Sequence, residues 1–228
     1  MKKISALLLC FLALQNYAFS QGFSATLKHS SIQIGPTYSN WSNYNDEKID
    51  MRETSNLGFD LALTQRFPFG KKEITGLNVG LGVSNVNLHT NFRTWEFDED
   101  GAVLGNHILM DPDKYLKNKL SLTYIEIPLE LSFAAKRGDS TKTKPGFKFA
   151  LGWRTGICVD AHNKYKTEDA IDKRKDFDNI NRLRYGPTVR IGFGMFSIYG
   201  RYDLSSTFKA TNVPNYNLYS AGIIFSGY

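Results

Sequence analysis

Residues 124–133 read YIEIPLELSF, and in this stretch apolar side chains occupy every second position. Ile125, Ile127 and Leu129 belong to the apolar set, whereas Glu126 and Glu130 belong to the other set. Successive side chains of a β-strand point to opposite faces, so this period of two predicts a strand with one apolar and one polar face.

The same alternation recurs along the chain and predicts eight strands. They lie near residues 31–38, 57–64, 76–83, 124–133, 147–157, 183–193, 198–204 and 219–225. Aromatic residues make up 14% of the chain and there are 19 glycines, a mixture more typical of half-buried strands than of helices. With 42% apolar and 22% charged residues, the chain is not disordered by composition. A mean hydropathy of -0.33 and the lack of a long apolar run exclude a helical membrane protein.

The connections between these strands are sorted by length. They are long at 41–55, 89–118 and 161–181, fairly long at 206–215, medium at 136–145, and short at 68–73 and near 194–197. Long and short connections alternate, as they do in outer-membrane barrels, whose periplasmic turns are short and whose extracellular loops are long. A soluble sandwich has no reason to sort its loops in this way.

Small and charged residues share one face of the strands, and bulky apolar residues share the other. In the strand at 183–193, Arg184 and Arg190 lie on the same face as Gly186 and Gly192. Small residues suit the tightly curved inner wall of a closed sheet, so we interpret this face as the interior and the apolar face as facing lipid. A closed barrel is the form in which strands satisfy every backbone group in hydrocarbon.

We therefore predict an all-β fold, an eight-stranded antiparallel transmembrane up-and-down β-barrel with short periplasmic turns and long extracellular loops. It would form one domain over residues 21–228. The structural alternative is a soluble, lipocalin-like barrel with a ligand in its interior, in which every strand would face the opposite way.

Ten charged residues fall on the inward face and form the predicted lumen charge network. They are Asp60, Arg66, Glu126, Glu130, Lys148, Arg154, Arg184, Arg190, Arg201 and Asp203. An eight-stranded barrel is only wide enough for its own side chains, and buried charges are costly unless they are paired. We expect Arg–carboxylate pairs that plug the interior, with a structural role rather than a role in ion conduction or proton relay.

Aromatic residues near the strand ends are expected to form interfacial girdles. The residues in question are Tyr38, Trp41, Phe67, Tyr185, Tyr202 and Tyr219.

The first 20 residues have the form of a secretory signal peptide. A basic start precedes the apolar run 4–14, and the small-x-small tripeptide AFS at 18–20 precedes Gln21. The exported chain then keeps a single cysteine, Cys158, which excludes an internal disulfide and a zinc-binding cysteine spacing. We expect no metal site and no cofactor.

Three stretches resemble strands of a known family. They are YIEIPLEL at 124–131, GFGMFSIYGRY at 192–202 and GIIFSGY at 222–228. They are similar to the small outer-membrane β-barrel family common in Bacteroidetes, which is often labelled porin-like or PorT-like. The resemblance implies an outer-membrane location and a barrel architecture, and it implies little about activity. It also implies an aromatic C-terminal signal for the outer-membrane assembly machinery, which we expect at Phe225 and Tyr228.

The leading functional hypothesis is a non-enzymatic, monomeric barrel that anchors surface loops in the membrane. Two of the long loops carry charge of opposite sign. The loop at 89–118 is acidic and also holds two aromatic residues, with Trp95, Phe97, Asp98, Glu99, Asp100, Asp111 and Asp113. The loop at 161–181 is basic, with Lys164, Lys166, Lys173, Arg174 and Lys175. These loops would pair with each other or contact lipopolysaccharide and its bridging cations. The expected partners are outer-membrane lipids, lipopolysaccharide, the assembly machinery and an unidentified protein. A subunit of a secretion or envelope assembly, as the PorT-like label would allow, is the alternative.

A lipid-modifying enzyme is a further alternative, and it requires a His with a Ser and a carboxylate near the outer rim. His89 and His162 flank the upper ends of two predicted strands, and Asp160 lies two residues before His162. No nearby Ser carries a nucleophile motif, so we expect no catalysis, and Cys158 is expected to point inward and pack. Nucleic-acid binding is set aside, because the basic residues of this exported chain are divided between lumen and loops.

Overall fold

Strands account for nearly all of the part of the chain that the structure describes. The computed structural model describes residues 29–42, 55–70, 73–89, 117–134, 146–166, 171–175, 180–209 and 216–226, and the statements below concern these residues. The strands are β1 (Ser30–Trp41), β2 (Leu57–Phe69), β3 (Thr75–His89), β4 (Lys117–Ala134), β5 (Phe147–Lys166), β6 (Ile171–Lys175), β7 (Leu183–Phe193), β8 (Phe196–Ser206) and β9 (Asn217–Ser226). The predicted signal peptide at 1–20 lies outside the described residues.

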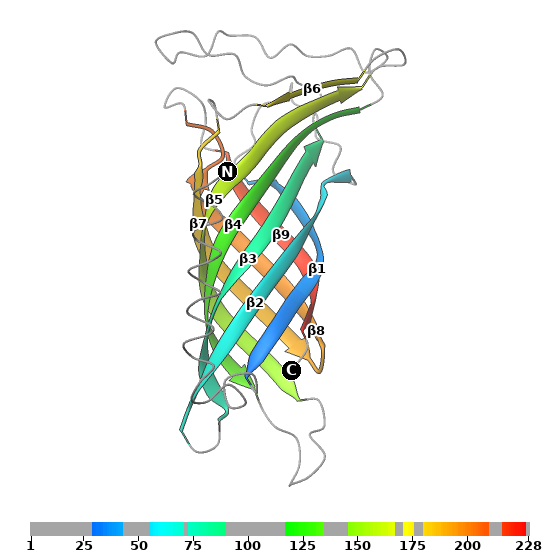
Figure 1. The fold of residues 1–228 in the computed structure, drawn as a ribbon. Coiled ribbons are helices and arrows are strands. Elements are labelled where there is room, and N and C mark those ends of the chain that lie inside the picture. The colour runs from blue at the N-terminus through cyan, green and yellow to red at the C-terminus, as the bar shows by residue number, and fades with distance from the viewer. Residues whose placement is uncertain are drawn as a thin grey trace, which may run out of the picture.

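Eight of the strands close into a barrel, and the ninth extends one wall. Consecutive strands pair antiparallel from β1 to β5, then β5 pairs with β7, β7 with β8 and β8 with β9. The β1–β9 pairing closes the ring (Figure 1). The predicted eight-stranded antiparallel up-and-down barrel is confirmed. Within the described ranges, no helix is both long enough and apolar enough to cross a membrane.

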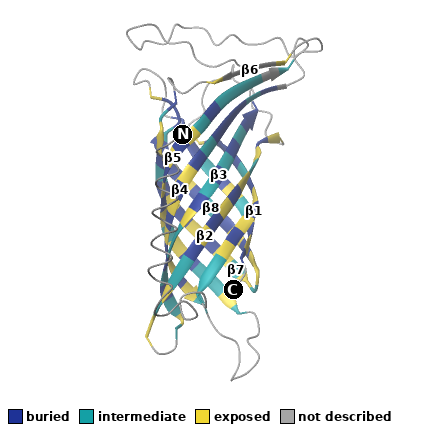
Figure 2. Ribbon diagram, viewed as in Figure 1, coloured by how far each residue is buried: buried dark blue, intermediate teal, exposed yellow. Residues whose placement is uncertain are grey.

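The two faces of the strands point as the alternation predicts. On β4, Ile125 and Ile127 are exposed on the outside, whereas Glu126 and Glu130 are buried inside. Figure 2 shows buried and exposed residues alternating along the strands of the barrel wall. The soluble-barrel alternative requires the opposite facing and is therefore wrong.

Connections of different length lie at the two ends of the barrel. The β2–β3, β4–β5 and β7–β8 connections share one end with the start of β1 and the end of β9. The shortest, between β7 and β8, consists of Gly194 and Met195, and Gly194 has a φ of 61°, a conformation that favours glycine. The β1–β2, β3–β4, β5–β7 and β8–β9 connections lie at the other end, where β6 also lies (Figure 1).

Part of the expected loop at 161–181 is a strand, which corrects the sequence prediction. β5 continues to Lys166, and β6 pairs antiparallel with this extension. β4 is also longer than predicted and begins at Lys117. A membrane strand needs about 9–11 residues, so β4 with 18 and β5 with 20 residues rise beyond the apolar belt. On the outer face of these extensions polar residues replace the apolar series, and on β4 the apolar residues Leu120 and Leu122 lie on the inward face instead.

Candidate functional site

The barrel interior carries most of the charged residues that the sequence places on the inward face. Eight of the ten are at least 93% buried, namely Asp60, Glu126, Glu130, Arg154, Arg184, Arg190, Arg201 and Asp203. They come from β2, β4, β5, β7 and β8, and each occupies an inward position of its strand.

Glu126 lies at the centre of the largest group. Its Oε1 accepts a hydrogen bond of 2.6 Å from Nη1 of Arg201 and lies 3.7 Å from Nη1 of Arg184. Its Oε2 accepts from Nη1 of Arg154 at 3.4 Å, and the same Nη1 donates to Oδ2 of Asp60. One carboxylate from β4 thus joins guanidinium groups from three other strands.

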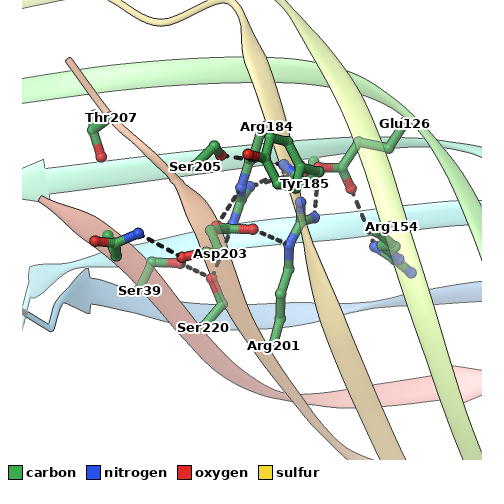
Figure 3. Close-up of polar contacts among 12 residues, drawn as sticks. Ser39, Glu126, Arg154, Arg184, Tyr185, Arg201, Asp203, Ser205, Thr207 and Ser220 are labelled. Carbon is green, nitrogen blue, oxygen red and sulfur yellow. Dashed lines mark hydrogen bonds and ion pairs between the residues drawn. The ribbon is translucent and has the colours of Figure 1, made fainter. Parts of the chain in front are cut away.

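Asp203 completes this group on the side nearer β6. Its Oδ2 accepts from Nε of Arg184 and its Oδ1 accepts from Nε of Arg201, each at 2.6 Å (Figure 3). Arg184 also donates from Nη2 to Oγ of Ser220 at 3.3 Å and from Nη1 to Oγ of Ser84 at 3.4 Å. We call Asp60, Glu126, Arg154, Arg184, Arg201 and Asp203 the lumen network, which contains three arginines and three carboxylates and is formally neutral.

A second ion pair lies closer to the end with the short connections. Nη2 of Arg190 donates to Oε2 of Glu130 at 2.7 Å, and Nδ2 of Asn78 lies 3.4 Å from the same oxygen. The inward charges therefore form two separate groups among the described residues rather than one continuous chain.

Arg66 and Lys148 lie apart from the lumen network. Arg66 is only half-buried, and its Nη2 donates to the backbone carbonyls of Glu73 and Ile74 at 2.9 and 3.0 Å. Lys148 is half-buried and lines a small cavity with Arg190. Both residues lie near the end with the short connections, where the lumen meets solvent and a charge needs no partner across the barrel.

Tyrosine rings cover two of the three guanidinium groups of the lumen network. Cζ of Arg154 lies 5.1 Å from the ring centre of Tyr199, and Cζ of Arg184 lies 5.0 Å from that of Tyr124. A desolvated cation over an aromatic ring gains about 2 kcal/mol. Tyr124 and Tyr199 fall on the inward face by alternation, but no local pattern shows which arginine each would cover.

Side chains fill the lumen at the network. Among the described residues, Oδ1 of Asp60, Nε of Arg154 and Nη2 of Arg201 have no hydrogen-bond partner. A cavity of about 10 Å³ is lined by Asp60, Tyr199 and Arg201, which is room for about one water molecule. Ligand pockets occupy roughly 300–1,000 Å³, so this cavity offers no space for a small-molecule ligand.

An apolar layer lies above the lumen network, towards the end with β6, and the alternation did not predict it. Twelve buried residues form it, namely Trp41, Val86, Leu88, Leu120, Leu122, Tyr124, Cys158, Ala161, Ile180, Phe208, Tyr216 and Leu218. The available signal was the change on β4, whose inward positions turn from glutamate to leucine above Tyr124. Beyond the membrane the outer face meets water, so the barrel can be packed there like a soluble one.

Trp41 corrects the predicted aromatic girdle. It is 4% exposed, its ring packs 5.7 Å from Phe208 and 5.2 Å from Tyr216, and its Nε1 donates to Oγ1 of Thr207 at 3.1 Å. The reason is the strand period, since Trp41 is an even number of residues from the inward Thr37.

The other five aromatic residues of the predicted girdle lie on the outer face. Phe67 and Tyr202 are exposed, Tyr185 is half-buried and stacks on Trp153 with 6.2 Å between ring centres, and Tyr38 and Tyr219 are half-buried with centres 6.4 Å apart.

Cys158 and the two residues of the predicted assembly signal can also be placed. Cys158 is 4% exposed within the apolar layer, so its predicted inward packing is confirmed. Phe225 is exposed on the outside of β9, with its ring edge-on to Phe196 at 5.1 Å. Tyr228 lies outside the described residues.

The pair suggested by the spacing of Asp160 and His162 is formed on the outer face of β5. Nδ1 of His162 lies 2.6 Å from Oδ2 of Asp160. Ser121 on β4 lies directly opposite His162 in the strand register. Ser121 is 4% exposed, and its Oγ lies 3.4 Å from Nδ2 of Asn85. The sequence could not reveal Ser121, because a cross-strand neighbour depends on the register.

Metal-ligating side chains do not gather in the described ranges. No group of three or more His, Cys, Asp or Glu side chains there is arranged to hold a metal ion. The acidic residues predicted for the loop at 89–118 lie outside the described residues, whereas Lys164 and Lys166 lie on β5 and Lys173, Arg174 and Lys175 on β6.

Comparison with known proteins finds one family. A family model described as an outer membrane protein beta-barrel domain matches residues 19–207, which leaves only β9 of the barrel strands unmatched. No curated protein sequence matches the chain. Among solved structures, a triple mutant of the Rhodopseudomonas blastica porin is similar at 10% identity, over 87% of this chain and 98% of that chain, with a TM-score of 0.19. A likeness at this TM-score carries no argument about this chain.

Proposed function

This chain belongs to the outer membrane protein β-barrel domain family and lies in the cell outer membrane, and from this premise we propose that it is a non-enzymatic barrel with a plugged lumen. It anchors in the membrane a surface formed by the long connections and β6. The end with the short connections faces the periplasm, and the β6 end faces outward. The observation that carries the proposal is the lumen network, in which three arginines and three carboxylates from five strands meet around Glu126.

The geometry favours a plug over a channel. The side chains of Glu126, Arg154 and Arg201 are at most 2% exposed, and the cavity beside them has a volume of about 10 Å³. A barrel of eight strands leaves space only for side chains, whereas porins of 16–18 strands enclose water. Hydrated ions would have to separate the buried ion pairs in order to pass.

Conductance of single barrels in a planar lipid bilayer tests this function. The purified protein should give no conductance steps under conditions in which a 16-stranded porin gives large ones. Discrete steps from the wild-type protein that Glu126→Gln changes in size would show a conducting lumen and contradict the proposal.

The narrower resemblance to PorT-like barrels of Bacteroidetes would add a protein partner. In that case the chain would be a monomeric subunit of a secretion or envelope assembly, contacted at the β6 end. Cross-linking in intact cells, followed by mass spectrometry, tests this part. Cross-links from Lys173 and Lys175 to one reproducible protein would support a subunit role, and cross-links only within the chain would oppose it.

A lipid-modifying enzyme is a second candidate, favoured by the pair of Asp160 and His162 opposite Ser121. In this arrangement His162 would take the proton of the Ser121 hydroxyl as Oγ attacks a lipid ester carbonyl, and it would give that proton to the alcohol that leaves as the ester C–O bond breaks. Water, deprotonated by His162, would then hydrolyse the acyl-serine, which releases the fatty acid and returns the proton to Ser121. The burial of Ser121 makes it the less favoured proposal. Incubation with outer-membrane lipids tests it, because release of fatty acid that is lost in both Ser121→Ala and His162→Gln would establish the enzyme.

A further inference from the structure

The outer faces of β4, β5 and β6 carry lysines in adjacent positions above the apolar belt. In the strand register, Lys119 lies opposite Lys164, and Lys164 lies opposite Lys173. Residues directly opposite each other in an antiparallel pair share a face, with Cβ atoms about 4.5–5.5 Å apart. These three lysines therefore form a row across three strands. Lys166 and Lys175, two positions from Lys164 and Lys173, extend this row into what we call the lysine face.

A β-bulge places the lysines of β5 on the outside. Tyr124 lies opposite Cys158, but Thr123 lies opposite Asp160, which leaves Val159 as an extra residue on β5. Cys158 and Ala161 are both buried inside, although strict alternation would place them on opposite faces. An extra residue reverses the facing of everything that follows it. Without this bulge, Lys164 would point into the lumen.

Contacts between side chains confirm which face the row occupies. Nζ of Lys119 donates to Oδ1 of Asn87 at 2.8 Å, and Nδ2 of Asn85 donates to Oγ1 of Thr123 at 3.0 Å. Thr123 precedes Ile125 by one strand period, and Ile125 is 50% exposed on the lipid-facing side. The lysine face is therefore continuous with the surface that contacts lipid.

Four of its lysines carry charge that the described carboxylates do not balance. Lys164, Lys166, Lys173 and Lys175 form no ion pair with any carboxylate of the described ranges. Among the side chains that the structure describes on this face, the nearby carboxylate is that of Asp160, and it binds His162. Like charges directly opposite each other destabilise a sheet, so an external anion would stabilise the row.

We propose that the lysine face binds the phosphate groups of a phosphorylated glycolipid in the outer leaflet. This inference rests on the outward orientation of the β6 end in the proposed function. Exposed Ile157 and Val159 mark the top of the apolar belt on β5, and His162 and Lys164 follow on the same face. A lipid whose acyl chains lie against the belt would present its headgroup phosphates at this height. Ammonium groups bind phosphate as point charges and need no fixed planar geometry.

The acidic segment at 98–113 of the same chain could cover the lysine face in place of the lipid, since five of its residues are acidic. The lipid is favoured because the lysine row is continuous with the lipid-contacting surface, whereas an intramolecular cover would require no such continuity.

Binding of bisphosphorylated lipid A to the purified full-length mature barrel in uncharged detergent tests the inference. Microscale thermophoresis would compare the wild type, Lys164→Gln/Lys173→Gln, and the control Lys71→Gln/Lys72→Gln, which removes equal charge from the connection at the opposite end. We expect the first variant to bind about tenfold more weakly and the control to bind like the wild type. Dephosphorylated lipid A should bind the wild type about as weakly as bisphosphorylated lipid A binds the first variant.

Three results would overturn the inference. The first is binding that does not depend on charge, shown either by equal affinity of the wild type for phosphorylated and dephosphorylated lipid A or by unchanged affinity in Lys164→Gln/Lys173→Gln. The second is equally tight binding of inorganic phosphate, which would assign the face to free phosphate. The third is tighter lipid binding after Asp98→Asn/Glu99→Gln/Asp100→Asn, which would make the acidic segment the occupant. A variant that keeps its heat-dependent gel mobility is folded, so loss of lipid binding alone leaves the plugged, surface-displaying barrel standing.

Discussion

Nη1 of Arg201 on β8 donates a 2.6 Å hydrogen bond across the lumen to Oε1 of Glu126 on β4. The two strands are not neighbours, because β5 and β7 lie between them in the ring. The ion pair thus braces two separate parts of the wall and adds a contact that the hydrogen-bond ladders do not supply. Arg154 on β5 and Arg184 on β7, which also approach Glu126, extend the brace to further strands.

Replacing Glu126 with Gln should destabilise the barrel by about 3–5 kcal/mol, since it leaves buried guanidinium groups uncompensated. The shape of the side chain is retained, so the loss reports charge rather than volume. Urea unfolding in lipid vesicles, followed by tryptophan fluorescence, measures this change. Glu73→Gln, outside the lumen network, is the matched control and should change stability by less than about 0.5 kcal/mol. A Glu126→Gln barrel as stable as the wild type would mean that the network contributes nothing to folding.

Asp60 and Arg154 should show direct energetic coupling. Nη1 of Arg154 contacts Oδ2 of Asp60 from a strand three positions away around the barrel. We expect coupling in a double-mutant cycle of Asp60→Asn and Arg154→Gln. Arg154→Gln should lower the free energy of unfolding by about 1–3 kcal/mol less in the Asp60→Asn protein than in the wild type. Unfolding free energies of the four proteins measure the coupling. Strict additivity would show that the two side chains act independently.

Gly35 should tolerate no side chain, because a Cβ at this position would lie 1.8 Å from the backbone oxygen of Ile223 on β9. β1 and β9 form the pairing that closes the ring, so Gly35→Ala should cost about 3 kcal/mol or more and reduce the heat-modifiable folded band on gels. Gly200→Ala is the control, since its Cβ would meet only Cγ1 of Val189 at 3.2 Å. Equal folding yields for both variants would contradict the close approach at the closing pair.

Deleting Val159 should turn the upper part of β5 over. In a Cys158→Ser background, Lys164→Cys should react with a membrane-impermeant maleimide, because this position faces outward after the bulge. The deletion restores continuous alternation, so labelling at Lys164→Cys should fall several-fold while labelling at Asn163→Cys rises. Heat-dependent gel mobility would confirm that each variant is folded. Unchanged labelling at both positions would show that the bulge does not set the facing.

Local alternation was enough to predict much of this architecture. Ile125, Ile127 and Leu129 on one face, with Glu126 and Glu130 on the other, identify both the strand and its orientation. The period also placed eight of ten predicted lumen charges inside, and it would have placed Trp41 inside had it been followed to the end of β1. It did not reveal the upper part of β5 or β6, where the alternation between apolar and polar residues is lost above the membrane.

By itself the sequence determined the number of barrel strands, the side of each strand that faces lipid and the sign of the charges inside. These properties depend on a repeat of two residues, which each segment carries locally. The tertiary structure alone decided that Arg201 meets Glu126, that Arg154 meets Asp60, and that a bulge at Val159 turns Lys164 towards Lys119 and Lys173. Those relationships depend on the stagger of the strands around a closed ring and on one extra residue in a ladder. Both are properties of strand pairing, which no single segment contains.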